Sequence, residues 1–326
     1  MPYLVRIGLL VVFAGGVLGA AAPPLRTIAD APIDGPTERF DYESLDPARG
    51  LLFIADLARS RVVVFDTNAS RVVKMIGGIS SPHGILAVSA LGRVYVSATG
   101  TDEVAVIDEA KLEVIARVPA GRYPDGIAWD ARHRKLYVSD EHGASDTVID
   151  TATNIRLGAV PLGGDVGNTQ YDATDGRIYV AQQSANELVA IDPQTDTVLA
   201  RHRLSGCRGA HGLQLDEVRG LAYIACQDNA SLITFDLRRN AQTGRLGVGA
   251  DPDVLALDVS RARLYVACES GAVSVYDVRN RRLTKIAEWT LAVGAHVVMV
   301  DQHTHRLYFP LRDVNGRSVL RIMVPR

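Results

Sequence analysis

The sequence predicts an all-β protein, a seven-bladed β-propeller built from four-stranded antiparallel blades. Seven short segments, each centred on an aromatic residue, recur with spacings of 42, 42, 42, 44, 42 and 43 residues. The aromatic residues are Phe53, Tyr95, Tyr137, Tyr179, Tyr223, Tyr265 and Tyr308. Repeats of this length are typical of propellers, solenoids and repeat arrays.

The content of one repeat separates these architectures. Between residues 84 and 121 the chain has four short runs rich in Val, Ile and Tyr, and the gaps between them are short and rich in turn formers. Runs of this kind, with turn signals about every 8–12 residues, predict β-strands. No convincing helical period occurs beyond residue 22, so helical repeats are excluded. Four strands in each repeat indicate a propeller blade.

Aspartates recur at two turns of the repeat. One stands seven residues before most of the aromatic residues, as Asp130 does before Tyr137, and another closes the third strand, as Asp108 does. An aspartate side chain accepts hydrogen bonds from the backbone of a tight turn. We therefore interpret these periodic carboxylates as turn formers rather than as catalytic acids.

The length of 326 residues would suit two domains, but the repeats predict one. The last repeat lacks a fourth strand, whereas Leu25–Ile33 is an orphan strand that matches the fourth strands of other repeats. We therefore expect residues 23–326 to form a single domain, a ring closed by this N-terminal strand, which completes the last blade. The blades are predicted near residues 38–79, 80–121, 122–163, 164–207, 208–250, 251–292, and 293–326 plus 25–35.

Residues 1–22 have the pattern of a secretory signal peptide. Arg6 is followed by an apolar run from Ile7 to Leu18 and then by small residues up to Ala22. The run is shorter than the roughly 20 residues that a membrane-spanning helix needs. A retained N-terminal anchor is the alternative. We expect a periplasmic or secreted protein whose mature chain has no membrane span.

Charge and composition bound the range of partners. The formal net charge is −2, so no overall positive charge favours binding to nucleic acid. Nucleic acid is therefore not predicted as a partner. The chain also lacks a nucleophile elbow, a phosphate-binding loop and a haem-attachment motif. The expected partner is an unidentified protein or a small-molecule ligand, and the protein is expected to be a monomer.

The repeats resemble those of a known family. The segments RVYVSATGTDEVAVID, KLYVSDEHGASDTVID and RIYVAQQSANELVAID are similar to the repeats of YVTN-type (YncE-like) β-propellers. The segments SPHGILAVSALGRVYVSA and YPDGIAWDARHRKLYVSD have the turn-strand pattern of that family, and the resemblance covers all seven repeats. It implies a propeller and, for function, secreted binding proteins. Similar propellers include sugar-lactone hydrolases and a streptogramin lyase, so the fold does not decide the activity.

The candidate ligand-binding residues come from one position of the repeat. In a propeller the first strand of each blade lines the central channel, and the loops entering these strands share one rim. Residues 12 before each aromatic residue are expected on that rim, and six of the seven are His or Asp. They are Asp41, His83, Asp125, Gly167, His211, Asp253 and His296, with Arg39 and Asn168 beside them in sequence.

A metal at this rim is a second hypothesis. Residues three past each aromatic residue are expected to form a second ring near the first, with Cys226 roughly opposite His211 and Cys268 roughly opposite Asp253. Nested rings of His, Asp and Cys have the ligand types of a zinc or transition-metal site, so a divalent metal held by His83, His211 and His296 is considered. The alternative is a polar lining that faces a water-filled channel.

Three cysteines allow at most one internal disulfide, which an oxidising compartment would permit. Cys207–Cys226 and Cys226–Cys268 are both considered. The favoured function is binding of a partner or small ligand through the polar channel rim. The alternative is a metal-assisted hydrolase or lyase, lactonase-like or streptogramin-lyase-like, that uses the same rim. An electron-transfer or metallocentre accessory protein is a third class.

Overall fold

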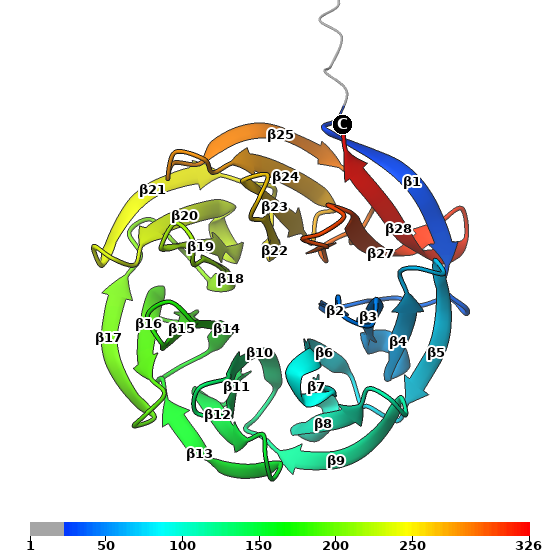
Figure 1. Cartoon of the computed structure of the whole chain (residues 1–326). Coiled ribbons are helices and arrows are strands. Elements are labelled where there is room, and N and C mark those ends of the chain that lie inside the picture. Colours follow the sequence, from blue (N-terminus) through cyan, green and yellow to red (C-terminus); the bar gives the residue numbers. More distant parts are fainter. Residues whose placement is uncertain (1–22) are drawn as a thin grey trace, which may run out of the picture.

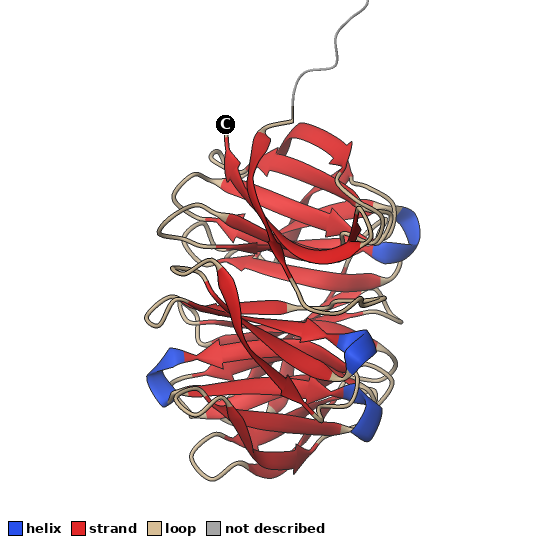
Figure 2. Cartoon of the chain, turned by 90° about the vertical axis from the view of Figure 1, so that its right-hand side faces the viewer, coloured by secondary structure: helices blue, strands red, loops and turns tan. Residues whose placement is uncertain are grey.

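A computed structural model describes residues 23–326 and confirms the predicted fold. Seven four-stranded antiparallel sheets are arranged in a ring (Figure 1). Seen from the side, the ring is a disc with short 3-10 helices at both faces (Figure 2). The predicted signal peptide, residues 1–22, lies outside the described residues. Among the described residues no helix has the length and apolarity needed to cross a bilayer.

Blades one to six each follow one pattern, with their strands in chain order from the axis outward (Figure 1). Blades one to three contain β2 (Glu43–Asp46), β3 (Leu51–Asp56), β4 (Arg61–Asp66) and β5 (Arg71–Gly77); β6 (Pro82–Val88), β7 (Arg93–Ala98), β8 (Glu103–Asp108) and β9 (Glu113–Pro119); and β10 (Pro124–Asp130), β11 (Lys135–Asp140), β12 (Ser145–Asp150) and β13 (Ile155–Pro161). Blades four to six contain β14 (Val166–Asp172), β15 (Arg177–Gln182), β16 (Glu187–Asp192) and β17 (Thr197–Arg203); β18 (Ala210–Asp216), β19 (Leu221–Cys226), β20 (Ser231–Asp236) and β21 (Ala241–Gly247); and β22 (Pro252–Asp258), β23 (Arg263–Cys268), β24 (Ala272–Asp277) and β25 (Thr284–Thr290).

Four 3-10 helices lie in turns of the blades. They are η1 (Leu57–Arg59), η2 (Ser89–Leu91), η3 (Thr99–Thr101) and η4 (Gln227–Asn229). η1, η3 and η4 each follow the second strand of a blade, at the face where the chain enters the inner strands. η2 joins the first and second strands of blade two, at the opposite face.

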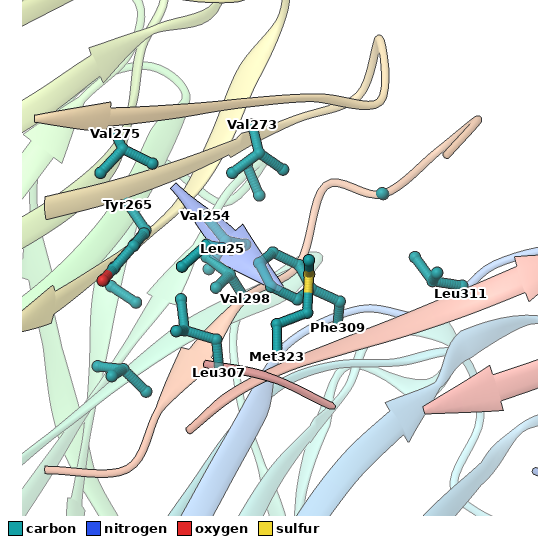
Figure 3. Close-up of a cluster of buried hydrophobic side chains, with 14 of the residues drawn as sticks. Leu25, Val254, Tyr265, Val273, Val275, Val298, Leu307, Phe309, Leu311 and Met323 are labelled. Atoms are coloured by element: carbon teal, nitrogen blue, oxygen red, sulfur yellow. The ribbon is translucent and has the colours of Figure 1, made fainter. Parts of the chain in front are cut away.

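The seventh blade joins the two ends of the described chain. Its strands run in the order β26 (Met299–Val300), β27 (Leu307–Val314), β28 (Arg317–Pro325) and β1 (Leu25–Pro32). β1 pairs antiparallel with β28 and is the outermost strand (Figure 1). Leu25 belongs to the apolar cluster between blades six and seven that also contains Tyr265, Val275 and Met323 (Figure 3). The predicted closure by an N-terminal strand is therefore confirmed.

The recurring aromatic residues form the contacts between blades. All seven have relative exposures of 0–1%. Phe53 of blade one packs with Val94 and Val96 of blade two, and Tyr95 of blade two packs with Leu136 of blade three. Buried aromatic rings contribute large apolar contact areas to such interfaces. The aromatic period seen in the sequence is thus the period of the interfaces between blades.

The recurring aspartates hold turns, as predicted. Asp130 Oδ1 accepts hydrogen bonds from the backbone nitrogens of Arg132 and His133, at 2.8 and 3.2 Å. Asp108 Oδ1 does the same at the end of the third strand in blade two, where both donors lie at 3.0 Å. These carboxylates are occupied by backbone donors and belong to the framework of the fold.

Candidate functional site

The loops that enter the inner strands enclose a small acidic pocket, here called the rim pocket. It has a volume of about 150 Å³. Its lining includes five of the seven residues at the predicted repeat position, together with Arg39: these five are Asp41, His83, Asp125, His211 and Asp253. The structure therefore brings together residues from blades one, two, three, five and six at one end of the ring axis.

Four further residues line the rim pocket, and the sequence analysis did not single them out. They are Tyr42, Tyr123, Glu141 and Gln227. Glu141 and Gln227 each directly follow the second strand of a blade, four residues past the aromatic residue. The prediction of a second ring three residues past the aromatic residue was wrong by one position.

The strand register explains this error. Cys226 pairs with Ala210 and Cys268 pairs with Pro252, and an irregularity follows each pair. The expected partners were His211 and Asp253, one residue later. Because side chains alternate between faces of a strand, a shift of one residue turns them to the other side. Both sulfur atoms accordingly lie within apolar clusters rather than at the rim.

The centre of the rim pocket is a histidine between two carboxylates. His211 Nε2 lies 3.6 Å from Asp253 Oδ1 and 3.9 Å from Asp125 Oδ2. The three residues are 7%, 4% and 3% exposed, respectively. Within residues 23–326, no hydrogen-bond partner exists for Asp125 Oδ1, Asp253 Oδ1 or His211 Nδ1. Buried polar atoms normally have hydrogen-bond partners, so these three atoms could form hydrogen bonds with a bound ligand.

Burial and mutual repulsion make these groups resist charging. Burial raises the pKa of Asp125 well above its usual range, and the charges of Asp41 and Glu141 raise it further. Burial also raises the pKa of Asp253, to about 7. Burial lowers the pKa of the His211 imidazole. The site therefore holds carboxyl groups that lose their protons easily only when a positive charge arrives.

Arg39 is the one guanidinium in the lining of the rim pocket. Its Nη2 atom lies 2.6 Å from Glu269 Oε1, and its Nε atom lies 3.6 Å from Asp41 Oδ2. Burial opposes its charge, but Asp41 and Glu269 outweigh burial and raise the pKa of Arg39. The lining sets this guanidinium against four carboxyl groups, those of Asp41, Asp125, Glu141 and Asp253. The pocket is thus an acidic site in which the positive charge of Arg39 balances only part of the negative charge of the carboxyl groups.

Two other predicted histidines have defined tautomers. His83 Nδ1 lies 2.9 Å from the Ser81 carbonyl, which can only accept, so Nδ1 donates. Its Nε2 atom lies 3.2 Å from the Tyr123 hydroxyl. His296 Nδ1 lies 3.0 Å from the Gly294 carbonyl, and its buried Nε2 has no partner among the described residues. Neutral His296 therefore presents a free lone pair at Nε2.

The structure separates the three histidines considered as metal ligands. His296 lies instead with Asp253 and Glu269, and one ligand atom from each falls within 4.8 Å of the others. Among the described residues this is the only such group of His, Cys, Asp or Glu. One imidazole nitrogen and two carboxylates are donors that suit zinc, manganese or iron. One of these carboxylates, that of Glu269, is already paired with the Arg39 guanidinium.

Gly167 and Asn168, also predicted at the rim, do not line the rim pocket but have structural roles beside it. A Cβ atom on Gly167 would lie 2.6 Å from His211 Cα, so the residue must lack a side chain for blades four and five to meet. Asn168 Nδ2 donates to the Tyr42 hydroxyl at 2.5 Å. This bond joins blade four to blade one. Tyr42 lines both the rim pocket and a larger cavity beyond it, whereas Asn168 lines only the latter.

Of the two disulfide pairings considered, the structure contains Cys207–Cys226, with a sequence separation of 19. Cys268 is a free, buried thiol, and burial raises its pKa to about 12. A thiol that resists ionisation is a poor nucleophile and a poor metal ligand. Cys268 is therefore part of the core.

Loss of this disulfide is expected to lower the free energy of unfolding by about 3 kcal/mol, because the cross-link restricts the unfolded chain. Urea unfolding of the Cys207→Ser variant, with and without reductant, measures this. Reductant should destabilise the unaltered protein and a Cys268→Ala control, and it should leave Cys207→Ser unchanged. Equal stability of the unaltered protein with and without reductant would contradict the pairing.

Comparisons with known proteins define the class of fold. No family model matches the chain, and no curated protein matches its sequence. Hydrazine synthase from Kuenenia stuttgartiensis is similar in structure, with a TM-score of 0.75 and 16% identity over 88% of this chain and 95% of that one. A streptogramin B lyase structure gives a TM-score of 0.77 and 10% identity over 93% and 97%. At these identities the likeness shows the fold alone: the protein is a seven-bladed β-propeller.

Proposed function

We propose that this chain is an exported, monomeric binding propeller of the YVTN-repeat (YncE-like) type, with residues 23–326 as a single domain. Its rim pocket binds the cationic group of a small ligand or protein partner. The observation that carries this proposal is the set of buried, unpartnered polar atoms around His211, in a lining where four carboxyl groups face one guanidinium.

The chemistry of the rim pocket favours a cation over other ligands. Asp125 and Asp253 are nearly fully buried, and burial followed by the charge of Asp41 raises the pKa of each of them. An arriving positive charge would relieve this repulsion and allow both carboxyl groups to ionise. The volume of about 150 Å³ is smaller than a drug-sized pocket, so it accommodates one charged group rather than a whole large molecule.

Export is supported by two observations. The first 22 residues have the signal-peptide pattern, and Cys207 and Cys226 form a disulfide. Disulfides persist in oxidising compartments and are rare in the cytosol. A periplasmic or secreted protein would meet its ligand outside the cytosol.

A second function uses the same rim. Asp253, Glu269 and His296 could hold a divalent metal, and this favours the metal-assisted hydrolase or lyase as the alternative. A bound metal would supply Lewis acidity for a carbonyl group. His211, whose pKa is lowered by burial, would be neutral near pH 7 and able to accept a proton.

Cationic probes are expected to stabilise the protein against heat, whereas anionic probes are not. Choline, putrescine and arginine amide are the cationic probes, and acetate and phosphate are the anionic ones. A probe present at about 100 times its Kd adds about 2.7 kcal/mol to the free energy of unfolding. Asp125→Asn should abolish the increase in Tm, and the exposed Asp34→Asn substitution should preserve it.

The same proteins, with Glu269→Gln added, are analysed for bound metal. Retention of the cation response with no metal supports binding without metal chemistry. Stoichiometric metal that is lost in Glu269→Gln and retained in Asp34→Asn would favour the alternative function. An equal response to anionic probes, or an unchanged response in Asp125→Asn, would contradict cation binding at the rim pocket.

A further inference from the structure

A second, larger cavity lies beyond the bond between Tyr42 and Asn168, and we call it the apolar cavity. It has a volume of about 550 Å³ and is lined by residues from the inner strands of all seven blades. The rim pocket uses residues at the start of these strands, whereas the apolar cavity extends along them to Val218 and Val259, beyond their ends. The inner strands that line both sites surround the central axis of the ring (Figure 1). The two sites therefore open toward opposite faces of the disc.

One residue of the apolar cavity breaks the repeat. Ten residues before each aromatic residue, six blades have an apolar residue or threonine, while blade one has Glu43. The equivalent residues are Ile85, Ile127, Thr169, Leu213, Leu255 and Val298, and all of them line the cavity with Glu43. A carboxyl group therefore occupies a position that in the other blades holds an apolar side chain or threonine.

The Glu43 carboxyl group has no internal partner. Its side chain is buried, with a relative exposure of 9%, and within the described part of the chain neither oxygen accepts or donates a hydrogen bond. Burial raises the pKa of Glu43 well above its usual range. An unpaired buried carboxyl group destabilises a fold, so its position calls for a partner from outside the chain.

The charges of the apolar cavity indicate what that partner is. Its lining contains two ionisable acids, Glu43 and Glu217, and among the lining residues there is no Lys, Arg or His. The remainder is largely hydrocarbon, including Leu86, Leu215 and Leu257. Val218 is 67% exposed at the end of the cavity, which gives an apolar entrance. Such a lining complements a molecule that is apolar and positively charged.

We propose that the apolar cavity binds an apolar amine, whose hydrocarbon part packs on the leucine side chains and whose ammonium group pairs with Glu43. The amine enters in its protonated form. On binding, Glu43 releases its proton to solvent, and the ammonium N–H groups donate to the carboxylate. This site is separate from the rim pocket and does not depend on the function proposed for it.

Displacement of a fluorescent probe tests this inference. N-phenyl-1-naphthylamine, which fluoresces in apolar sites, is titrated into the protein and then displaced with octylamine, octan-1-ol or octanoate. Octylamine should displace the probe at a concentration about tenfold or more lower than octan-1-ol, because a hydrogen-bonded charge contributes that much. Octanoate should be the weakest, since it meets a second carboxyl group.

Variants locate the binding. Glu43→Gln, which keeps the side-chain shape, and Glu43→Leu, which matches Leu213 and Leu255 of other blades, should both remove the preference for octylamine. Gln214→Trp, within the lining, should reduce probe binding, whereas Leu199→Trp on outer strand β17 should not. Asp125→Asn alters the rim pocket and should leave the octylamine preference in place.

Three outcomes would overturn the inference. These are equal displacement by octylamine and octan-1-ol, a preference that persists in Glu43→Gln and Glu43→Leu, and calorimetry that detects no octylamine binding. A fourth outcome would also overturn it: loss of the preference in Asp125→Asn alone would place the amine at the rim pocket instead of the apolar cavity. Failure of the choline and putrescine experiment would not affect these results, since choline has no long hydrocarbon chain and putrescine carries a charge at both ends of its short one.

Discussion

Deletion of residues 25–33 is expected to abolish cooperative folding of the ring. These residues form β1 and its continuation, and they complete the seventh blade. Leu25 and Ile33 are 2% and 3% exposed, and burial of two such side chains contributes roughly 3–6 kcal/mol. That amount alone is comparable with the net stability of about 5–15 kcal/mol that folded proteins have. The deletion would also expose the edge of β28 to other chains.

Circular dichroism melting and size-exclusion chromatography measure this effect. A chain that begins at Pro23 is the control and should melt in a sharp transition. The Asp30→Ala substitution is a milder variant. It removes the paired contacts of Asp30 with Arg321, at 2.7 and 2.8 Å, and should lower stability by at most about 1 kcal/mol because the pair lies at the surface. A sharp, unchanged melting transition after deletion of 25–33 would show that closure does not depend on β1.

Asp253→Asn is expected to stabilise the protein at pH 8 while weakening cation binding at the rim pocket. The carboxyl group of Asp253 is buried, and burial raises its pKa to about 7, against about 3.9 in an unfolded chain. Between these values the folded state holds a proton that the unfolded state has released. The free energy of unfolding therefore falls as pH rises and becomes level above about pH 7. From pH 5 to pH 7 the fall is about 2 kcal/mol, because the carboxyl group is half ionised at pH 7.

Melting temperatures of the unaltered protein and Asp253→Asn, measured from pH 5 to pH 8, give a difference curve. His211 acts in the opposite direction, because its lowered pKa makes stability rise with pH near 6, but it is present in both proteins. The difference should therefore grow toward pH 7 and then become constant. Asp34→Asn, an exposed control, should give no such curve. A difference independent of pH would show that Asp253 does not titrate in this range.

The fold was predictable because each blade repeats the same physical requirements. Tyr95 and its equivalents must fill the interface to the next blade, so they recur at the period of the blades. Gly84 is required for a different reason: a Cβ atom there would lie 1.8 Å from the Asp125 carbonyl oxygen of the neighbouring blade. The aromatic residue recurs in all seven blades and this glycine in three of them, as Gly84, Gly126 and Gly212, so the architecture is readable in one sequence.

The candidate site was predictable only in part. The position that carries Asp125 and His211 could be found because it has a constant offset from the aromatic residue. Glu141 was missed because the irregular pairing at the start of the inner strands shifts the register by one residue. The bond from Asn168 to Tyr42 joins blades distant in the ring, and no sequence offset indicates it.

Glu43 was missed although the sequence contains a signal for it. The aspartates of the repeat drew attention to carboxylates at turns, whereas Glu43 is a carboxylate at a position that is otherwise apolar or carries threonine. Comparison of the seven blades at each position, rather than a search for clusters of one residue type, would have identified it. In a repeat protein the residues that depart from the repeat are the ones that the framework does not explain.

The hydrogen bond between Tyr42 and Asn168 joins blades one and four between the rim pocket and the apolar cavity. Tyr42 lines both the rim pocket and the apolar cavity, so this bond lies where the two sites meet. A substitution at Tyr42 would therefore alter both sites, whereas a substitution at Asp125 or Glu43 would alter the lining of only one. Under the two proposals, one small ring offers two recognition sites, one for a cationic group and one for an apolar amine.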